Sequence, residues 1–301
     1  MEKKQFKKEN PLKRVVAPYL EILPAMAAIM IFVIYPMIRA ITMSFYDTSL
    51  VNRSKSKFVG LKNFIGMFRS TAFKKAMVNT SIYTLVMVVA TLILALLFAV
   101  WMGKKETKLN QTAQAVVFLP HVISMVSVAM IFTQMMEPRY GIFNTILSAL
   151  GLPSSQWMQS SETALKSVLF ISLWKNIGYY TLIFIAALQS IPVSILEAAA
   201  LDKAGELKTF FKITLPMISP QIFFTLIILT IGNFKVFDTI RLTTAGGPNN
   251  ATTSIVYYIY EQAFVKADLG RACAGAVVLL GVSLVLTLLY FKALSKKVHY
   301  Q

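Results

Sequence analysis

Six long apolar stretches dominate the 301-residue sequence and constrain its fold more than any other feature. Each is about as long as the roughly 20 residues that an α-helix needs to cross the hydrocarbon core of a bilayer. The stretches lie at residues 17–42, 77–103, 111–136, 167–189, 216–237 and 272–291. Strands of a transmembrane barrel would alternate polar and apolar residues, which these stretches do not. The sequence therefore predicts an all-α polytopic membrane protein with six transmembrane helices in a single domain, residues 1–301.

The amino-acid composition agrees with a membrane protein. Hydrophobic residues make up 56% and charged residues 14% of the chain, whereas soluble domains have about 45–50% and about 25%. The net charge of +17 would suit a nucleic-acid-binding protein, but the basic residues are scattered through connecting segments, as expected beside anionic lipid. We therefore expect contact with membrane lipid and none with nucleic acid. A single cysteine, Cys273, excludes an internal disulfide.

The two ends of the chain are predicted to lie in the cytoplasm. Residues 1–16 form a basic tail, and the apolar stretch that follows is long enough to span, so no cleavable signal peptide is evident. The positive-inside rule then places the tail and the C-terminus on the cytoplasmic side. The bias is small, because the first outer loop is itself rich in Lys and Arg.

That first outer loop contains a short amphipathic pattern. Leu61, Phe64, Ile65 and Phe68 recur at i, i+3, i+4 and i+7, which predicts a helix. Such a helix can lie on the membrane face as a lipid anchor. Contact with a soluble partner is the alternative.

The polar connection at residues 190–215 is longer than a turn between two spans requires, at about 25 residues. An Ala-rich segment at residues 196–201 favours helix. Gly205 can adopt backbone conformations that other residues avoid, so a bend is expected there. Pro216 fits the first turn of the next transmembrane helix. The connection is therefore predicted to be helix, bend, helix.

Within this connection lies a motif of fixed spacing. It consists of Glu197-Ala198-Ala199, then Gly205 eight residues after the Glu, then Ile213-Thr214-Leu215-Pro216. The motif resembles the signature of permease subunits of binding-protein-dependent ABC importers. Nearly the whole chain shares the resemblance, through residues 59–64, 118–120, 187–192, 237–238, 246–248 and 251–253. The carbohydrate-uptake branch, which includes maltose-type and glycerol-3-phosphate-type permeases, is the most similar.

The resemblance implies a type I importer permease fold in a bacterial or archaeal cell membrane. It implies that residues 190–215 face the cytoplasm and dock on a dimer of ATPase subunits. The residues implied in this coupling are Glu197, Ala198, Ala199, Asp202, Gly205, Leu215 and Pro216. Further implied partners are a second, homologous permease and an extracytoplasmic substrate-binding protein.

The sequence lacks the motifs of an enzyme. No G-x-x-x-x-G-K-[ST] phosphate loop is present, so ATP and Mg²⁺ are expected on the partner ATPase, and this chain is expected to hold no cofactor. Its two histidines, His121 and His299, do not have the spacing of a metal site. Neither a catalytic nor a metal-binding residue is predicted.

Polar side chains inside the fourth and fifth apolar stretches are candidates for substrate contact, since such groups are costly in a membrane and usually face a cavity. The candidates are Lys175, Asn176, Tyr179, Asn233 and Lys235. By the resemblance, Tyr179 and Asn233 fall near positions where the family contacts substrate. Trp174, Phe234 and Phe237 add aromatic faces that can stack on a sugar ring.

Two questions about substrate stay open from the sequence. Lys175 can instead snorkel to the surface or pair with a carboxylate on another helix. A di- or oligosaccharide is the first choice, but two lysines near one cavity would also suit glycerol 3-phosphate or a related polyol phosphate. An ion-coupled secondary transporter is the rival from another class. It would be expected to carry carboxylates within its spans, whereas the acidic residues here lie almost all at span ends or in loops.

Overall fold

The computed structural model describes residues 11–49, 56–103 and 107–294, and most of these are helical. Among the described residues, five helical segments are long and apolar enough to cross a membrane. They are Tyr19–Met43, Thr71–Gly103, Ala164–Gln189, Ser219–Thr243 and Leu269–Lys292. The segments confirm five of the six predicted spans as helices and confirm the all-α fold class.

The third predicted span is not one helix. Residues 111–136 are divided between α5 (Lys108–Val122) and α6 (Met125–Met135), and the two axes differ by 96°. Between them, Ile123 and Ser124 have extended backbone, with ψ of 138° and 136°. Pro120, in the last turn of α5, has no N–H to give to the helix. The prediction of a continuous helix is therefore wrong, because the chain leaves helical geometry just after the proline.

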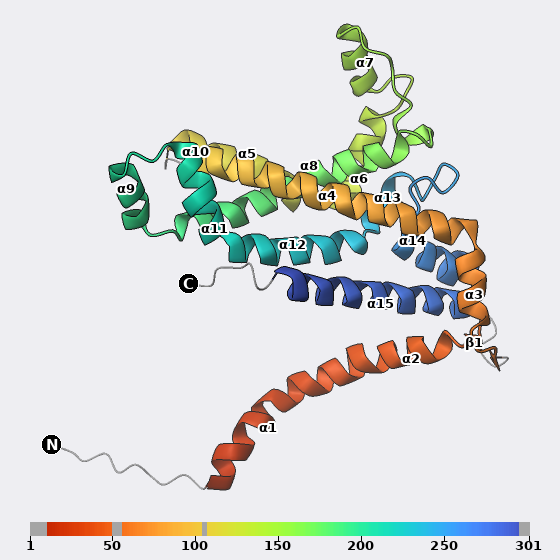
Figure 1. The fold of residues 1–301 in the computed structure, drawn as a ribbon. Helices are drawn as coiled ribbons and strands as arrows, with labels where there is room; N and C mark the ends of the chain where they lie inside the picture. Colours follow the sequence, from red (N-terminus) through yellow and green to blue (C-terminus); the bar gives the residue numbers. More distant parts are fainter. Residues whose placement is uncertain (1–10, 50–55, 104–106, 295–301) are drawn as a thin grey trace.

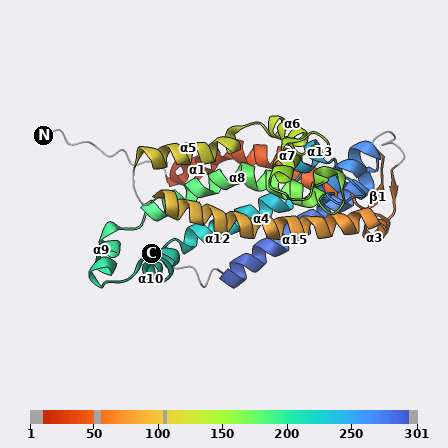
Figure 2. The same cartoon turned by 90° about the horizontal axis from the view of Figure 1, so that it is seen from above.

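The bundle is built around α4 (Thr71–Gly103), which packs against α8 (Ala164–Gln189), α12 (Ser219–Phe234) and α5 (Figures 1 and 2). Small residues of α4 lie at these contacts. Ala95 and Ala99 are fully buried beside Phe184 of α8. Small side chains allow helix backbones to approach closely, which is how helices associate when lipid removes the hydrophobic driving force.

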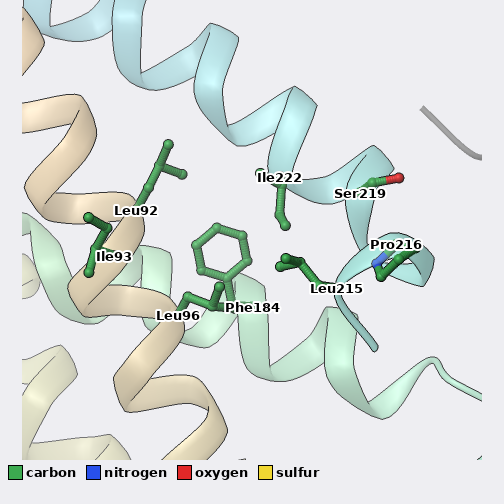
Figure 3. A pocket seen from close by; sticks show the side chains of 8 residues that line it. All are labelled: Leu92, Ile93, Leu96, Phe184, Leu215, Pro216, Ser219 and Ile222. Carbon is green, nitrogen blue, oxygen red and sulfur yellow. The ribbon is translucent and has the colours of Figure 1, made fainter. Parts of the chain in front are cut away.

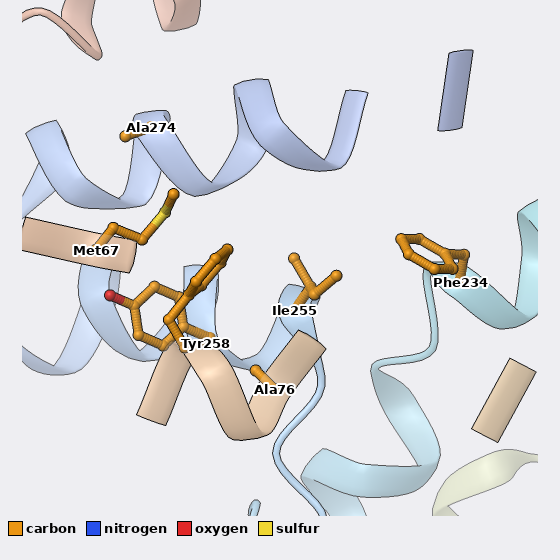
Figure 4. Close-up of a cluster of buried hydrophobic side chains, with 7 residues drawn as sticks. Met67, Ala76, Phe234, Ile255, Tyr258 and Ala274 are labelled. Atoms are coloured by element: carbon orange, nitrogen blue, oxygen red, sulfur yellow. The ribbon is translucent and has the colours of Figure 1, made fainter. Parts of the chain in front are cut away.

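A second core lies at the opposite end of α4 from the loop between α8 and α12 (Figure 4). It gathers Met67 of α3 (Lys62–Arg69), Phe234 at the end of α12, Tyr258 of α14 (Ile255–Tyr260) and Ala274 of α15 (Leu269–Leu294). The helix predicted in the first outer loop is thus present as α3. Its buried residues are Asn63 and Met67, and Phe64 packs against the same core.

The N-terminal helical segment diverges from the bundle. It comprises α1 (Pro11–Ile29), η1 (Met30–Ile34) and α2 (Tyr35–Met43), of which α2 packs against α15 while α1 bends away (Figure 1). None of the span-forming window in Tyr19–Met43 is buried. The start of α1 and the end of α15 lie toward the same end of the molecule as α9 (Figure 1).

Short elements cap the end of the bundle away from α9. They are β1 (Tyr46–Asp47), which pairs with β2 (Lys57–Phe58), then α7 (Ile142–Ala149), η3 (Trp157–Gln159), α13 (Asp238–Thr243) and η5 (Glu261–Val265). The arm that carries α7 projects from the body of the molecule (Figure 1). Asn144 anchors this arm: its amide donates to the carbonyls of Pro138 and Ser155, and its Oδ1 accepts from Ser155 N and Trp157 Nε1.

Candidate functional site

The connection between α8 and α12 folds as helix, turn, helix, as the sequence predicts. The first helix is α9 (Val193–Leu201), and α10 (Glu206–Thr209), η4 (Phe210–Thr214) and α11 (Leu215–Met217) follow the turn. Together they form a knob at one end of the molecule (Figures 1 and 2).

The turn is made by Lys203, not by Gly205. Lys203 has a left-handed φ of +50°, and the Ala204 N–H donates to Ala199 O over 3.0 Å while Lys203 N–H donates to Ala200 O. These two hydrogen bonds form a Schellman motif, in which a lysine occupies the left-handed position that is usually a glycine. Gly205 is extended, with φ −63° and ψ 154°. The expected bend at Gly205 is therefore wrong, because the helix has already been terminated two residues earlier.

Large apolar side chains of this knob face outward. Leu201 is 83% exposed, Leu207 77% and Phe211 61%. Charged side chains surround them: Glu197, Asp202, Lys203, Glu206, Lys208 and Lys212 are all exposed. Ala199 alone of the predicted Glu-Ala-Ala residues is buried, while Glu197 and Ala198 are exposed. Exposed apolar groups rimmed by polar ones are typical of surfaces that contact another protein or a membrane.

The base of the knob reaches into the bundle. Leu215 and Pro216 line an apolar cavity of about 430 Å³ together with Leu96 of α4, Phe184 of α8 and Ile222 of α12 (Figure 3). Pro216 is the second residue of α11, and α12 begins after a one-residue break at Ile218. Movement of the knob would therefore shift side chains at the contact between α4, α8 and α12.

The candidate substrate residues on α8 lie within little more than one helical turn. Lys175 Nζ donates to the carbonyl oxygens of Pro120, His121 and Ile123 at 3.3, 3.2 and 2.6 Å. Its ammonium is turned toward these carbonyls and, among the described residues, meets no carboxylate, so neither of the two alternatives raised by the sequence is found there. Asn176 Nδ2 donates to Ser172 O one turn back on the same helix, at 2.8 Å.

Tyr179 is stacked on the imidazole of His121. The two ring centroids are 4.7 Å apart and the planes differ by 16°. Tyr180 meets the edge of Tyr179 at 5.1 Å. Tyr179 remains 40% exposed, so part of its ring is open to a ligand.

The candidates on α12 lie at its end. Asn233 is half-buried and donates to Leu229 O, while Lys235 is exposed and ends the helix. Phe234, between them, is buried in the core of Figure 4 and is not available for stacking on a sugar. Phe237 instead meets Tyr257 and Tyr260 of α14.

A hydrogen bond beside the two groups of candidates connects the segments that carry them. The backbone carbonyl of Ser172 accepts from Asn176, and the Ser172 hydroxyl oxygen lies 3.4 Å from Thr239 Oγ1 of α13, the short helix that follows Lys235. Among the described residues no hydrogen bond joins Lys175, Asn176 or Tyr179 directly to Asn233 or Lys235. The structure thus brings α8 and the end of α12 together without joining the two polar groups.

Residues 95–299 match the family model described as binding-protein-dependent transport system inner membrane component. The match covers more than half of the chain. The chain belongs to this family.

The chain also matches individual relatives over nearly their full length. It is 34% identical over 280 residues to the probable ABC transporter permease protein YurN of Bacillus subtilis strain 168, covering 92% of this chain and 95% of the relative. It is 35% identical over 285 residues to the sn-glycerol-3-phosphate transport system permease protein UgpA of Escherichia coli strain UTI89, covering 94% and 96%.

Solved structures of ABC transporters also match the chain over nearly its full length. A chain in the crystal structure of a bacterial alginate ABC transporter, in complex with an alginate pentasaccharide-bound periplasmic protein, matches with a TM-score of 0.83 and 27% identity, covering 95% of the permease and 96% of that chain. A chain of a bacterial ABC transporter involved in the import of alginate matches with a TM-score of 0.84 and 27% identity, covering 96% and 98%. The family and the type I permease fold expected from the coupling motif are confirmed.

Some residues of the permease near the candidate site were not anticipated. His121 stands out in the sequence because it is a histidine inside an apolar stretch. Its stacking on Tyr179, however, depends on the break in the third span. Tyr257, Tyr260 and Phe264 recur at i, i+3 and i+7, and Arg241 lies over the Tyr260 ring at 5.4 Å. That helical spacing could have placed the three rings on one face.

Proposed function

We propose that the permease is one of two homologous membrane subunits of an ABC importer for a di- or oligosaccharide. The observation that carries the proposal is the knob of residues 190–215, whose exposed Leu201, Leu207 and Phe211 form an apolar surface at one end of the bundle. A pair of ATPase subunits, which bind ATP and Mg²⁺, covers this surface. The knob is cytoplasmic, and the chain ends, including the tail of residues 1–16, share its side. The whole chain is one membrane domain, without an ATPase site or cofactor of its own.

Coupling runs through the base of the knob. When the ATPase subunits close on ATP, they shift α9 and the helix that begins at Glu206. Leu215 and Pro216 carry that shift to α4, α8 and α12, because the cavity they line lies between these helices. Glu197, Asp202 and Gly205 lie on the exposed part of the knob and contact the ATPase.

The substrate arrives on an extracytoplasmic binding protein and passes through the region between α8 and the end of α12. Tyr179 offers a partly exposed ring for stacking on a sugar, while Asn176 and Asn233 offer amides for its hydroxyls. Lys235 lies at the outer end of this path. One transporter matched in structure is an alginate ABC transporter, and the other is involved in the import of the acidic polysaccharide alginate, which supports a carbohydrate as substrate.

Glycerol 3-phosphate is the second candidate. Its support is the 35% identity to a glycerol-3-phosphate permease. Lys175 gives it less support than the sequence suggests, because the ammonium already has three carbonyl partners.

Uptake by proteoliposomes that contain the complete transporter and its binding protein tests the choice. Labelled neutral oligosaccharides, alginate oligosaccharides and glycerol 3-phosphate are supplied in turn. We expect ATP-dependent uptake of an oligosaccharide. Tyr179→Ala and Asn233→Ala should each raise KM about tenfold, the equivalent of one lost polar or stacking contact. Tyr140→Ala, on the exposed outer arm, is the matched control and should leave KM unchanged. Uptake of glycerol 3-phosphate alone would overturn the sugar assignment.

A further inference from the structure

The break between α5 and α6 frees backbone carbonyls within the membrane region. The last carbonyls of a helix have no donor within it, and here Ile123 and Ser124 are extended and supply none. Hydrocarbon offers no water to satisfy such groups, so another part of the protein must do so.

Lys175 of α8 supplies the missing donors. A lysine ammonium has three N–H groups and no acceptor, and Nζ lies within 3.3 Å of the oxygens of Pro120, His121 and Ile123. The positive charge also lies at the negative end of the α5 dipole. One side chain therefore satisfies the end of the broken helix in both hydrogen bonding and charge.

Two further contacts fix the same end of α5 on α8. A Cβ added at Gly178 would come within 2.0 Å of Val117 O, so the two backbones touch there. One residue later, Tyr179 stacks on His121. Lys175, Gly178 and Tyr179 thus hold α5 through its carbonyl cap, its backbone and its histidine ring.

We propose that Lys175 is a tethered cation that closes a carbonyl cage at the α5–α6 break and thereby positions His121 against Tyr179. In ion-driven transporters, unwound carbonyls and helix C-terminal ends bind Na⁺. Here the covalently attached ammonium fills that place, so the break needs no external ion. Lys175 is a positioning residue rather than a substrate ligand. The inference rests on the proposed function only in taking Tyr179 as the residue that meets substrate.

Inter-spin distances across the break test the proposal without any substrate. Cys273→Ala removes the single cysteine, after which Val116→Cys on α5 and Met130→Cys on α6, both exposed, accept spin labels. The assembled transporter is purified, and the distance is measured by pulsed electron paramagnetic resonance. We expect a narrow distribution that broadens and shifts in Lys175→Met. Lys166→Met, an exposed lysine on the same helix, is the matched control and should keep the parent distribution.

Amine rescue identifies the ammonium as the cause. In Lys175→Ala, n-propylammonium, which has three N–H donors, should restore the narrow distribution, whereas tetramethylammonium, which has none, should not. A Lys175→Met distribution equal to the parent's would overturn the proposal. If Lys175→Met yields no assembled transporter, Lys175→Ala is purified with and without n-propylammonium, and the amounts of assembled transporter are compared. A transporter recovered only with the amine supports the cage. Equal amounts with and without the amine, or none in either case, contradict it. A wrong substrate assignment would leave all these distances unchanged.

Discussion

Gly178 lies directly against Val117, and a Cβ on the glycine would be 2.0 Å from the Val117 carbonyl oxygen. The clash could not be relieved by a side-chain rotation, because the Val117 oxygen and the Gly178 Cα that would carry the Cβ both belong to helix backbones. The position therefore admits no side chain.

Gly178→Ala should destabilise the permease. The added methyl forces α5 from α8, and overpacking of this kind costs about 1–3 kcal/mol. Thermal unfolding of the solubilised transporter should show a lower Tm. Gly232→Ala in α12 is the matched control, since nothing lies within 4 Å of its Cβ position. An alanine in a helix is favoured over glycine by about 0.5–1 kcal/mol, so the control should be neutral or slightly stabilising. Equal Tm values for the two variants would contradict the close approach.

Asn144→Ala should loosen the arm that carries α7. The change removes a side chain that makes four hydrogen bonds and leaves backbone groups of the arm unpaired, at a cost of about 1–3 kcal/mol each if they stay buried. Limited proteolysis should cleave the arm around residues 136–163 faster, with a change in Trp157 fluorescence. Ser148→Ala, an exposed residue of the same helix, should leave the cleavage rate as it was. A protease-resistant Asn144→Ala arm would show that this amide is not the anchor.

Ile93→Trp should slow transport without releasing the partner subunits. Ile93 lines the apolar cavity that Leu215 and Pro216 also line (Figure 3), and a larger ring fills the space into which the base of the knob can move. The measurement is the initial uptake rate in proteoliposomes beside the subunit composition of the complex. Leu97→Trp, one turn along α4 and outside the cavity lining, controls for the bulk of the indole. Equal rates for Ile93→Trp and the parent would mean that the cavity does not change during the cycle.

Gly205→Ala should leave stability unchanged, because the residue is extended and its Cβ position is open. Surface changes of this type usually fall within about 0.5 kcal/mol. If the ATPase covers this position, as we propose, Gly205→Leu should lower coupled ATP hydrolysis while the Tm stays constant. A large fall in Tm would instead assign the glycine a role in folding.

The apolar spans and the knob could be predicted because each depends on local sequence alone. Span length follows from hydropathy, and the knob follows from a motif of fixed spacing. The left-handed turn at Lys203 could not be foreseen, because a lysine seldom takes that conformation while a glycine stands two residues away.

The details of the substrate region depend on contacts between distant residues. Pro120 was visible in the third span, but prolines are tolerated in membrane helices when other groups satisfy the freed backbone. The group that does so, Lys175, is 52 to 55 residues away, and its partners are carbonyls, which carry no sequence signature. Phe234 likewise turns into a core that four other elements build.

The central claim, that residues 190–215 join this permease to a separate ATPase, is tested most directly by co-purification from native membranes in gentle detergent. The parent chain is compared with Leu207→Glu on the knob and with Leu61→Glu. Leu61 is also an exposed leucine, but it lies at the opposite end of the molecule. We predict that the parent and Leu61→Glu bring down a second permease and an ATPase with a phosphate-loop motif, and that Leu207→Glu keeps the permease but loses the ATPase. Recovery of the parent chain without an ATPase, or full retention of the ATPase by Leu207→Glu, would contradict the account.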